Sequence, residues 1–173
     1  MAGDPATALV VREARAADRD AIVEYNLRLA RETESKALDR GVLAEGVARA
    51  LADPERLRYW VAEVDGSIVG QAAITREWSD WRNGWLWWFQ SVYVRAESRG
   101  MGVFRALYGH IRAAALAEPD VIGLRLYVEE ENHSAQETYR ALGMRAGGYQ
   151  VFEEIWTDRF SRCAPGEESG SVH

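Results

Sequence analysis

The sequence contains a single cysteine, Cys163, among its 173 residues. One cysteine excludes a disulfide within the chain and a zinc site built from several thiolates. The N-terminal stretch MAGDPATALVVREA has neither the basic segment nor the long apolar run of a secretory signal peptide. No apolar stretch approaches the roughly 20 residues that cross a bilayer. We therefore expect a cytoplasmic protein with no membrane partner and no metal.

Positive charge is also scarce, because 21 lysines and arginines face 27 aspartates and glutamates and give a net charge of −6. Non-specific nucleic-acid binding relies on basic side chains that neutralise phosphates, so we expect no nucleic-acid partner. Apolar residues make up 47% of the chain, enough for a core, and the length is that of one domain. We expect this domain over residues 9–158, between tails at 1–8 and 159–173.

The apolar periodicity predicts a mixed α/β fold, in which a twisted sheet is flanked by helices. Asp18 is the expected N-cap of the first helix. Asp65-Gly66 predicts a tight hairpin turn, because both residues tolerate positive φ. Residues 77–84 are expected to form a loop before a long buried strand. The expected strands are 9–12, 59–64, 68–74, 85–94, 121–128 and 149–156, and the expected helices are 18–32, 42–51, 103–117 and 132–143.

The strongest chemical signal is the segment Arg99-Gly100-Met101-Gly102, which lies between the long strand and a helix. A helix start carries unpaired N–H groups and the positive end of the helix dipole. Glycines let an anion approach the backbone closely, so the segment predicts a phosphate seat. The local charge agrees: residues 95–112 hold four arginines and one glutamate, and 4 − 1 gives +3.

A Gly-x-Gly pair alone is more often an ordinary strand-to-helix turn. No Gly-Lys-Ser/Thr follows, which excludes a Walker A loop, and a third glycine is missing from the Rossmann pattern. The phosphate seat therefore needs a second, independent motif.

The stretch SVYVRAESRGMGVFRALYGHI resembles motif A of the GNAT superfamily of acetyltransferases, Arg/Gln-x-x-Gly-x-Gly/Ala. Arg99 and Gly102 match the first two positions, and Phe104 departs from the third. Downstream, YVEEENHSAQETYRALGM resembles motif B, with Asn132, Tyr139 and Gly143-Met144 at matching places. The order of elements also fits over residues 9–157. The resemblance implies the GNAT fold and acetyl-CoA as cofactor.

The resemblance also implies roles for individual residues. The strand backbone at 92–94 would pair with the pantetheine arm like an added strand. Backbone N–H groups of 99–104 would hold the pyrophosphate, and Asn132 would contact the pantetheine side. The Phe104 ring would point away from the phosphates and pack against the sheet. The implied cofactor-binding residues are Val92, Tyr93, Val94, Arg99, Gly100, Met101, Gly102, Val103, Phe104, Arg105 and Asn132.

Acetyl transfer to an amine needs a neutral amine, a donor for the tetrahedral oxyanion and a proton for the departing thiolate. A backbone N–H near Val92 is the expected oxyanion donor. Tyr139, placed by motif B, is the expected general acid, since a phenol titrates near ~10 and a thiol near ~8.5. The alternative is that Tyr139 only packs its ring under the sheet.

The general base is left open. Some relatives carry a glutamate on the central strand, but the matching positions here hold Trp88, Phe89 and Gln90. His110 and His133 are expected to be surface or capping residues. The candidates that remain, each also readable as a solvated loop carboxylate, are Glu32, Glu34, Glu77 and Asp80.

In this superfamily the acceptor side is shaped by the first helices, the loop before the central strand and the last strand. These segments combine carboxylates, among them Asp39, Glu153 and Glu154, with tryptophans. Ammonium groups bind well over indole faces, so we expect a small or medium cationic primary amine. Trp85, Trp87 and Trp88 are expected in the core or a dimer interface. The expected acceptor-binding residues are Glu32, Glu34, Trp78, Asp80 and Trp81.

Three functions follow from these expectations. The first is an N-acetyltransferase that acts directly on a primary amine. The second is a non-catalytic acetyl-CoA-binding sensor or regulatory module, because Phe104 and the missing strand glutamate depart from the family pattern. The third is a structural homodimer that uses its tryptophan surface. The phosphate seat and Tyr139 favour the first.

Overall fold

A computed structural model describes residues 8–148 and 150–156 of the chain. The chain divides into two compact units, Met1–Glu129 and Glu130–His173. Of the expected tails, only Ala8 lies within the described residues. No helix in the described part of the chain is both long enough and apolar enough to span a bilayer.

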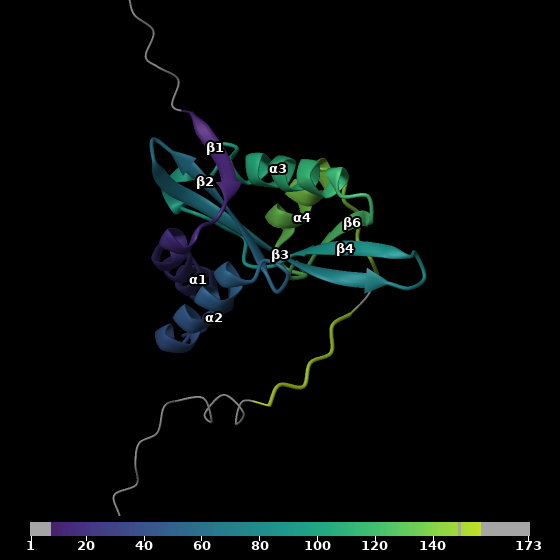
Figure 1. Cartoon of the computed structure of the whole chain (residues 1–173), viewed down its shortest axis with the longest axis horizontal. Coiled ribbons are helices and arrows are strands. Elements are labelled where there is room, and N and C mark those ends of the chain that lie inside the picture. Colours follow the sequence, from purple (N-terminus) through teal and green to yellow (C-terminus); the bar gives the residue numbers. More distant parts are fainter. Residues whose placement is uncertain (1–7, 149, 157–173) are drawn as a thin grey trace, which may run out of the picture. The chain divides into compact units, whose positions relative to one another are not determined.

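The first unit is built on a mixed sheet of six strands (Figure 1). The strand order is β1-β2-β3-β4-β6, and β5 also pairs with β3. All neighbours are antiparallel except β4 and β6, which are parallel. This arrangement confirms the predicted α/β class. The strands are β1 (Leu9–Glu13), β2 (Arg58–Val64), β3 (Ser67–Ser79), β4 (Gly84–Phe89), β5 (Tyr93–Val94) and β6 (Val121–Leu126).

Helices cover both faces of this sheet (Figure 1). On one face, α1 (Arg19–Glu34) and α2 (Arg40–Ala52) bury Ile22 and Val47 against Val61 of β2 and Ala73 of β3. On the opposite face lies α3 (Val103–Ala117). Because successive strand residues point to opposite faces, the register assigns every strand side chain to the α1/α2 face or to the α3 face.

The β2–β3 hairpin turn is formed as predicted. Asp65 has φ 50° and Gly66 has φ 75°, so both turn residues are left-handed, as a type I′ turn requires. This geometry matches the right-handed twist of the flanking strands and sets the β2–β3 register. The register brings Tyr59 of β2 opposite Ala73 of β3.

Two predictions about the next hairpin are wrong. Residues 77–79 belong to β3 rather than to a loop, because the Trp78 and Trp85 rings pair edge to face at 5.1 Å and extend the ladder. The turn shrinks to residues 80–83. The expected strand 85–94 is also not continuous, since residues 90–92 separate β4 from β5.

Asp18 does not cap α1 with its side chain, although it occupies the N-cap position. Its carboxylate accepts the Arg15 N–H at 2.6 Å and pairs with Arg12 Nη1 at 2.7 Å. Hydrogen bonding to Arg12 lowers the pKa of Asp18. The nearby arginine therefore draws the carboxylate away from the helix start and ties β1 to the short 3₁₀ turn at Ala16–Asp18.

The second unit contains α4 (His133–Ala141). The Asn132 side chain caps it by accepting the Ala135 N–H at 3.1 Å. Gly143 follows with φ 87°, the left-handed conformation with which glycine commonly ends a helix. The predicted last strand is wrong over 150–156, which adopt no strand and expose their apolar side chains instead of burying alternate ones. Tyr149 lies outside the described residues.

Candidate acetyl-CoA site

The long central strand is interrupted by a β-bulge. Phe89 pairs with Ile74, and Tyr93 pairs with Gln71. Between these pairs β3 has two residues, whereas the central strand has three, 90–92. One extra residue on one strand defines a bulge, which leaves that residue outside the ladder. The bulge therefore holds Val92, the predicted oxyanion donor, outside both β4 and β5.

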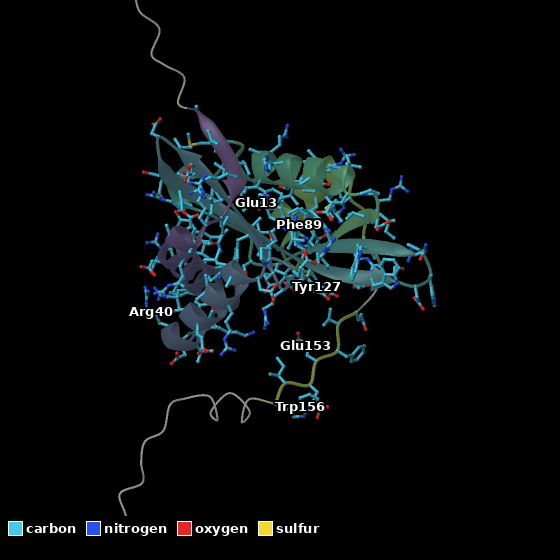
Figure 2. The ribbon with its side chains drawn as sticks, viewed as in Figure 1. Glu13, Arg40, Phe89, Tyr127, Glu153 and Trp156 are labelled. Atoms are coloured by element: carbon cyan, nitrogen blue, oxygen red, sulfur yellow. The ribbon has the colours of Figure 1, made fainter. Side chains whose placement is uncertain are left out.

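The ladder between β4 and β6 ends just before this bulge, at the pair Phe89–Leu126. Figure 2 labels Phe89, the last residue of β4, and Tyr127, the first residue after β6. Among the described strands, β5 pairs with β3 alone. One edge of Tyr93–Val94 thus faces no strand, and such an edge is the template on which an extended ligand adds main-chain hydrogen bonds.

The phosphate turn, residues 99–102, follows directly. Gly100 has φ 77° and Gly102 has φ 82°, values that glycine adopts without strain. A Cβ built on either glycine meets no atom within 4 Å, so both face open space. The first intrahelical bond of α3 runs from Ala106 N–H to Gly102 O at 2.9 Å, and the earlier N–H groups point out of the helix start. This cradle fits a pyrophosphate.

The Arg99 N–H is predicted to help hold the pyrophosphate. In the structure it donates to Ala96 O at 3.3 Å, so it is already engaged within the chain. The Arg99 side chain reaches back instead. Nε donates to Val94 O at 3.0 Å, and Nη2 lies 2.5 Å from Glu32 Oε2. The Tyr93 hydroxyl donates to the other Glu32 oxygen at 2.9 Å. Arg99 thus joins the phosphate turn, β5 and the end of α1.

These contacts hold Glu32, one of the expected acceptor-binding residues, against Arg99 and Tyr93. Hydrogen bonds from Arg99 and then Tyr93 lower the pKa of Glu32. A carboxylate with a lowered pKa is a weaker base than an ordinary one. Its partner Arg99 lies over the Tyr93 ring at 5.6 Å, so Glu32 is joined to two residues that the sequence predicts to bind the cofactor.

Phe104 packs as expected for a ring that avoids the phosphate turn. Its ring centroid lies 6.2 Å from that of Tyr108, one turn further along α3. Tyr108 in turn stacks on Phe89 at 5.8 Å. Phe104 is therefore linked to the sheet through Tyr108.

The expected acceptor residues are not brought to the bulge. Trp78 pairs with Trp85, four residues before Phe89, which at ~3.3 Å per residue puts it about 13 Å along the strand from the bulge. Trp78 also points to the α3 face, like its neighbour Arg76, which pairs with Glu118 just past α3. Asp80 and Trp81 lie in the hairpin turn, where Trp81 is 88% exposed. The Glu34 side chain lies outside the described residues.

A different tryptophan lies near the bulge on the α1/α2 face. Trp88 is only part-buried, and its ring centroid lies 4.5 Å from that of Tyr127. The Arg125 guanidinium lies over the indole at 5.4 Å and pairs with Glu77 at 3.0 Å. Of the three strand tryptophans expected in the core or a dimer interface, Trp87 is buried at 1% exposure, whereas Trp85 and Trp88 are part-buried.

In the second unit, α4 carries Tyr139, the expected acid. Burial raises the pKa of Tyr139 above its usual value of 10. A raised pKa keeps the phenol protonated, as a proton donor requires. Asn132, the expected pantetheine contact, has a structural role as the cap of the same helix. No cluster of three or more metal-ligating side chains occurs in the described part of the chain.

Sequence reasoning missed Asn26, Tyr59 and Gln71, which form a buried polar group beside the bulge. One signal was available. Gln71 stands in the strand run IVGQAAI, and Asn26 occupies the buried side of an amphipathic helix. A polar residue at a core position usually finds a polar partner, so the two could have been paired.

Comparison with known proteins decides the family. Residues 22–144 match the model of the acetyltransferase (GNAT) family. The chain belongs to the GNAT acetyltransferase family. A "possible acetyltransferase" from Clostridium difficile 630 is 42% identical, with a TM-score of 0.79, over 86% of this chain and 97% of that one. No curated protein sequence matches the chain significantly.

Two more distant GNAT structures share the fold. A "predicted acetyltransferase with acetyl-CoA" from Clostridium acetobutylicum is 18% identical, with a TM-score of 0.70, over 85% of this chain and 96% of that one. A ribosomal-protein-alanine N-acetyltransferase from Brucella melitensis biovar Abortus 2308 is 16% identical, with a TM-score of 0.67, over 86% and 100%. The GNAT family uses acetyl-CoA as its acetyl donor.

Proposed function

We propose that this protein transfers an acetyl group from acetyl-CoA directly to a primary amine. The observation that carries the proposal is the placement, on one continuous segment, of a strand bulge, an open strand edge and a left-handed glycine turn at a helix start. The open edge of Tyr93–Val94 suits the amide groups of the pantetheine arm. The N–H groups of the phosphate turn suit its pyrophosphate.

The residues divide the chemistry as follows. The neutral amine attacks the thioester carbonyl, and the new C–N bond pushes charge onto the carbonyl oxygen. The Val92 N–H, held in the bulge, donates to this oxyanion. As the C–S bond breaks, Tyr139 gives its proton to the thiolate. The amine loses its surplus proton to water, directly or through a carboxylate.

For the acceptor we propose a small or medium amine that arrives as a cation. Support comes from the net charge of −6, which attracts cations to the molecule. On the α1/α2 face beside the bulge, Trp88 and Tyr127 offer aromatic surface. We also propose a cytoplasmic location, in keeping with the lone Cys163, since disulfides are rare in reducing compartments.

The proposal is tested by the release of free thiol from acetyl-CoA in the presence of a panel of primary amines. Tyr139→Phe keeps the ring but removes the proton. We expect kcat to fall by about 10²-fold or more, within the range typical of general acids, with acetyl-CoA affinity retained. Tyr108→Phe, which removes a hydroxyl from a stacked ring on α3, is the matched control and should keep wild-type kcat.

The dependence of activity on pH also tests whether Tyr139 is the proton donor. Because the pKa of Tyr139 is raised, its phenol stays protonated through neutral pH, and activity should fall only as the pH rises above about 10. Tyr139→Phe should lack this alkaline limb. Tight acetyl-CoA binding without turnover on any amine would instead favour the sensor or regulatory module. Absence of binding would contradict the assignment of the site.

A further inference from the structure

A set of hydrogen-bonded polar side chains is buried beside the bulge. Gln71 Nε2 donates to Asn26 Oδ1 at 2.6 Å, and Asn26 Nδ2 donates to the Tyr59 hydroxyl at 3.3 Å. The Ser91 side chain, in the bulge itself, interacts with the same Tyr59 hydroxyl. We call Asn26, Tyr59, Gln71 and Ser91 the buried polar network. It joins α1, β2 and β3 to residues 90–92, the segment of the central strand between β4 and β5.

The strand register places this network directly under the bulge. Gln71 pairs with Tyr93, the first residue after the bulge. Tyr59 pairs with Ala73, whose carbonyl accepts the Gln90 N–H at 2.8 Å, the last ladder bond before it. Gln71 and Ala73 are two residues apart, so the side chains of Tyr59 and Gln71 both point to the α1/α2 face. Tyr59 therefore lies beside the start of the bulge, and Gln71 lies beside its end.

The amide and phenol side chains of this network are almost fully buried, and burying polar groups costs free energy. Gln71 is 0%, Tyr59 5% and Asn26 6% exposed. Gln71 Oε1 is buried with no hydrogen-bond partner among the described residues. An unsatisfied buried acceptor costs about 1–3 kcal/mol, and apolar residues of the same volume would avoid that cost. Apolar side chains would therefore make the fold at least as stable, which indicates that the network has a role besides stability.

We propose that the buried polar network fixes the conformation of the bulge and so aims the Val92 N–H at the reacting carbonyl. Tyr59 and Gln71 are then positioning residues for acetyl transfer, which act through the backbone and touch no substrate. This inference rests on the proposed function, because it assigns the network to the same reaction. A purely structural network would instead support folding and leave the chemical step unaffected.

Two variants separate these roles. Tyr59→Phe removes only the hydroxyl that links Asn26 to Ser91. The double variant Asn26→Leu with Gln71→Met replaces both amides by apolar groups, a change that can leave stability nearly unaltered. Both should lower kcat by about 10- to 100-fold, the size of effect that small misplacements produce, while the KM for acetyl-CoA stays within about twofold. Backbone amide exchange at residues 90–93 should become faster.

Tyr25→Phe is the matched control, because it also removes a buried tyrosine hydroxyl from the α1 face of the sheet. That hydroxyl donates to Ile68 O, outside the network. We expect kcat and exchange at 90–93 to match the wild type. Restoring the double variant to Asn26 and Gln71 one residue at a time should recover kcat only when both amides are present.

The outcomes are distinct. If Tyr59→Phe and the double variant keep kcat within twofold, or exchange at 90–93 like the wild type, the positioning role is overturned, even if their melting temperatures fall. If the wild type turns over no amine although it binds acetyl-CoA, the proposed function fails. Exchange at 90–93 then still decides whether the network controls the bulge.

Discussion

The two ends of the β3–β4 hairpin have little in common. At the bulge end, around Gln71 and Phe89, polar side chains are buried and the ladder is broken. At the turn end, around Trp78 and Trp81, the β3–β4 ladder is regular, the β4–β6 register shifts between Trp85 and Leu86, and the side chains are aromatic and exposed. The aromatic end looks more like a binding site in the sequence. The proposed function places the chemistry at the end where the β3 pairing is interrupted and polar side chains are buried, rather than at the end where aromatic side chains are exposed.

The largest expected effect comes from adding a methyl group at each end. A Cβ on Gly70 would lie 2.9 Å from Val103 Cγ1 and 3.2 Å from Tyr93 O. A Cβ on Gly84 would lie 2.4 Å from Ile122 Cγ2 and 3.0 Å from Asp120 O. Both Gly70→Ala and Gly84→Ala should lower the free energy of unfolding by about 1–3 kcal/mol, as overpacking does. Thermal denaturation measures this loss.

Only Gly70→Ala, the change at the bulge end, should also weaken the binding of acetyl-CoA. Gly70→Ala pushes the start of α3 and the Tyr93 carbonyl apart, so acetyl-CoA affinity should also fall by about tenfold in calorimetry. Gly84→Ala should bind acetyl-CoA like the wild type, which makes it the control for instability alone. If Gly70→Ala and Gly84→Ala lost the same acetyl-CoA affinity, the proposal that only the bulge end binds the cofactor would be contradicted.

A smaller effect is expected from Glu32→Gln, beside the phosphate turn. Glu32 partly neutralises Arg99, and removing its charge leaves more positive potential for the pyrophosphate. Both side chains are about half exposed, so the gain should be modest, within about fivefold in acetyl-CoA affinity, and smaller at high salt. Glu32→Ala would serve as a second variant, and weaker binding in both would contradict the account.

The pH dependence of this effect has a definite sign. Arg99 lowers the pKa of Glu32 below its ordinary value of 4.5, so the carboxylate is charged throughout the neutral range. The difference between wild type and Glu32→Gln should be fully present above that value. It should disappear as the pH falls through the lowered pKa, where the wild type also carries a neutral side chain.

The smallest effect belongs to the turn end. Trp81 is 88% exposed in the turn, so Trp81→Ala should change neither kcat/KM nor acetyl-CoA affinity beyond about twofold. Amine turnover assays check this expectation. A tenfold or larger increase in the KM for the amine, with kcat unchanged, would show that the amine binds at the turn end. That result would contradict the proposed difference between the two ends.

Much of the fold could be predicted from local sequence signals. Asp65-Gly66 fixed one hairpin, and the glycines of the phosphate turn marked the start of α3. The α/β class and family followed from the order of these elements and two motifs. Each of these signals depends on neighbouring residues, which a single sequence displays directly.

The rest depends on contacts between distant residues. The run WLWWFQSVYV reads as one strand, because an extra residue in a bulge changes the pairing but not the composition. The hydrogen bond between Arg99 and Glu32 joins residues 67 positions apart, and no local pattern displays it. The acceptor prediction followed the tryptophans, whereas the strand register separates Trp78 from the bulge by the length of β4.

Amide hydrogen exchange of the wild-type protein with and without acetyl-CoA tests the central claim most directly. The account predicts that acetyl-CoA protects residues 90–94 and 99–106, at the bulge and the phosphate turn, and leaves residues 77–86 at the turn end unchanged. Protection at the turn end without protection at the bulge would contradict it.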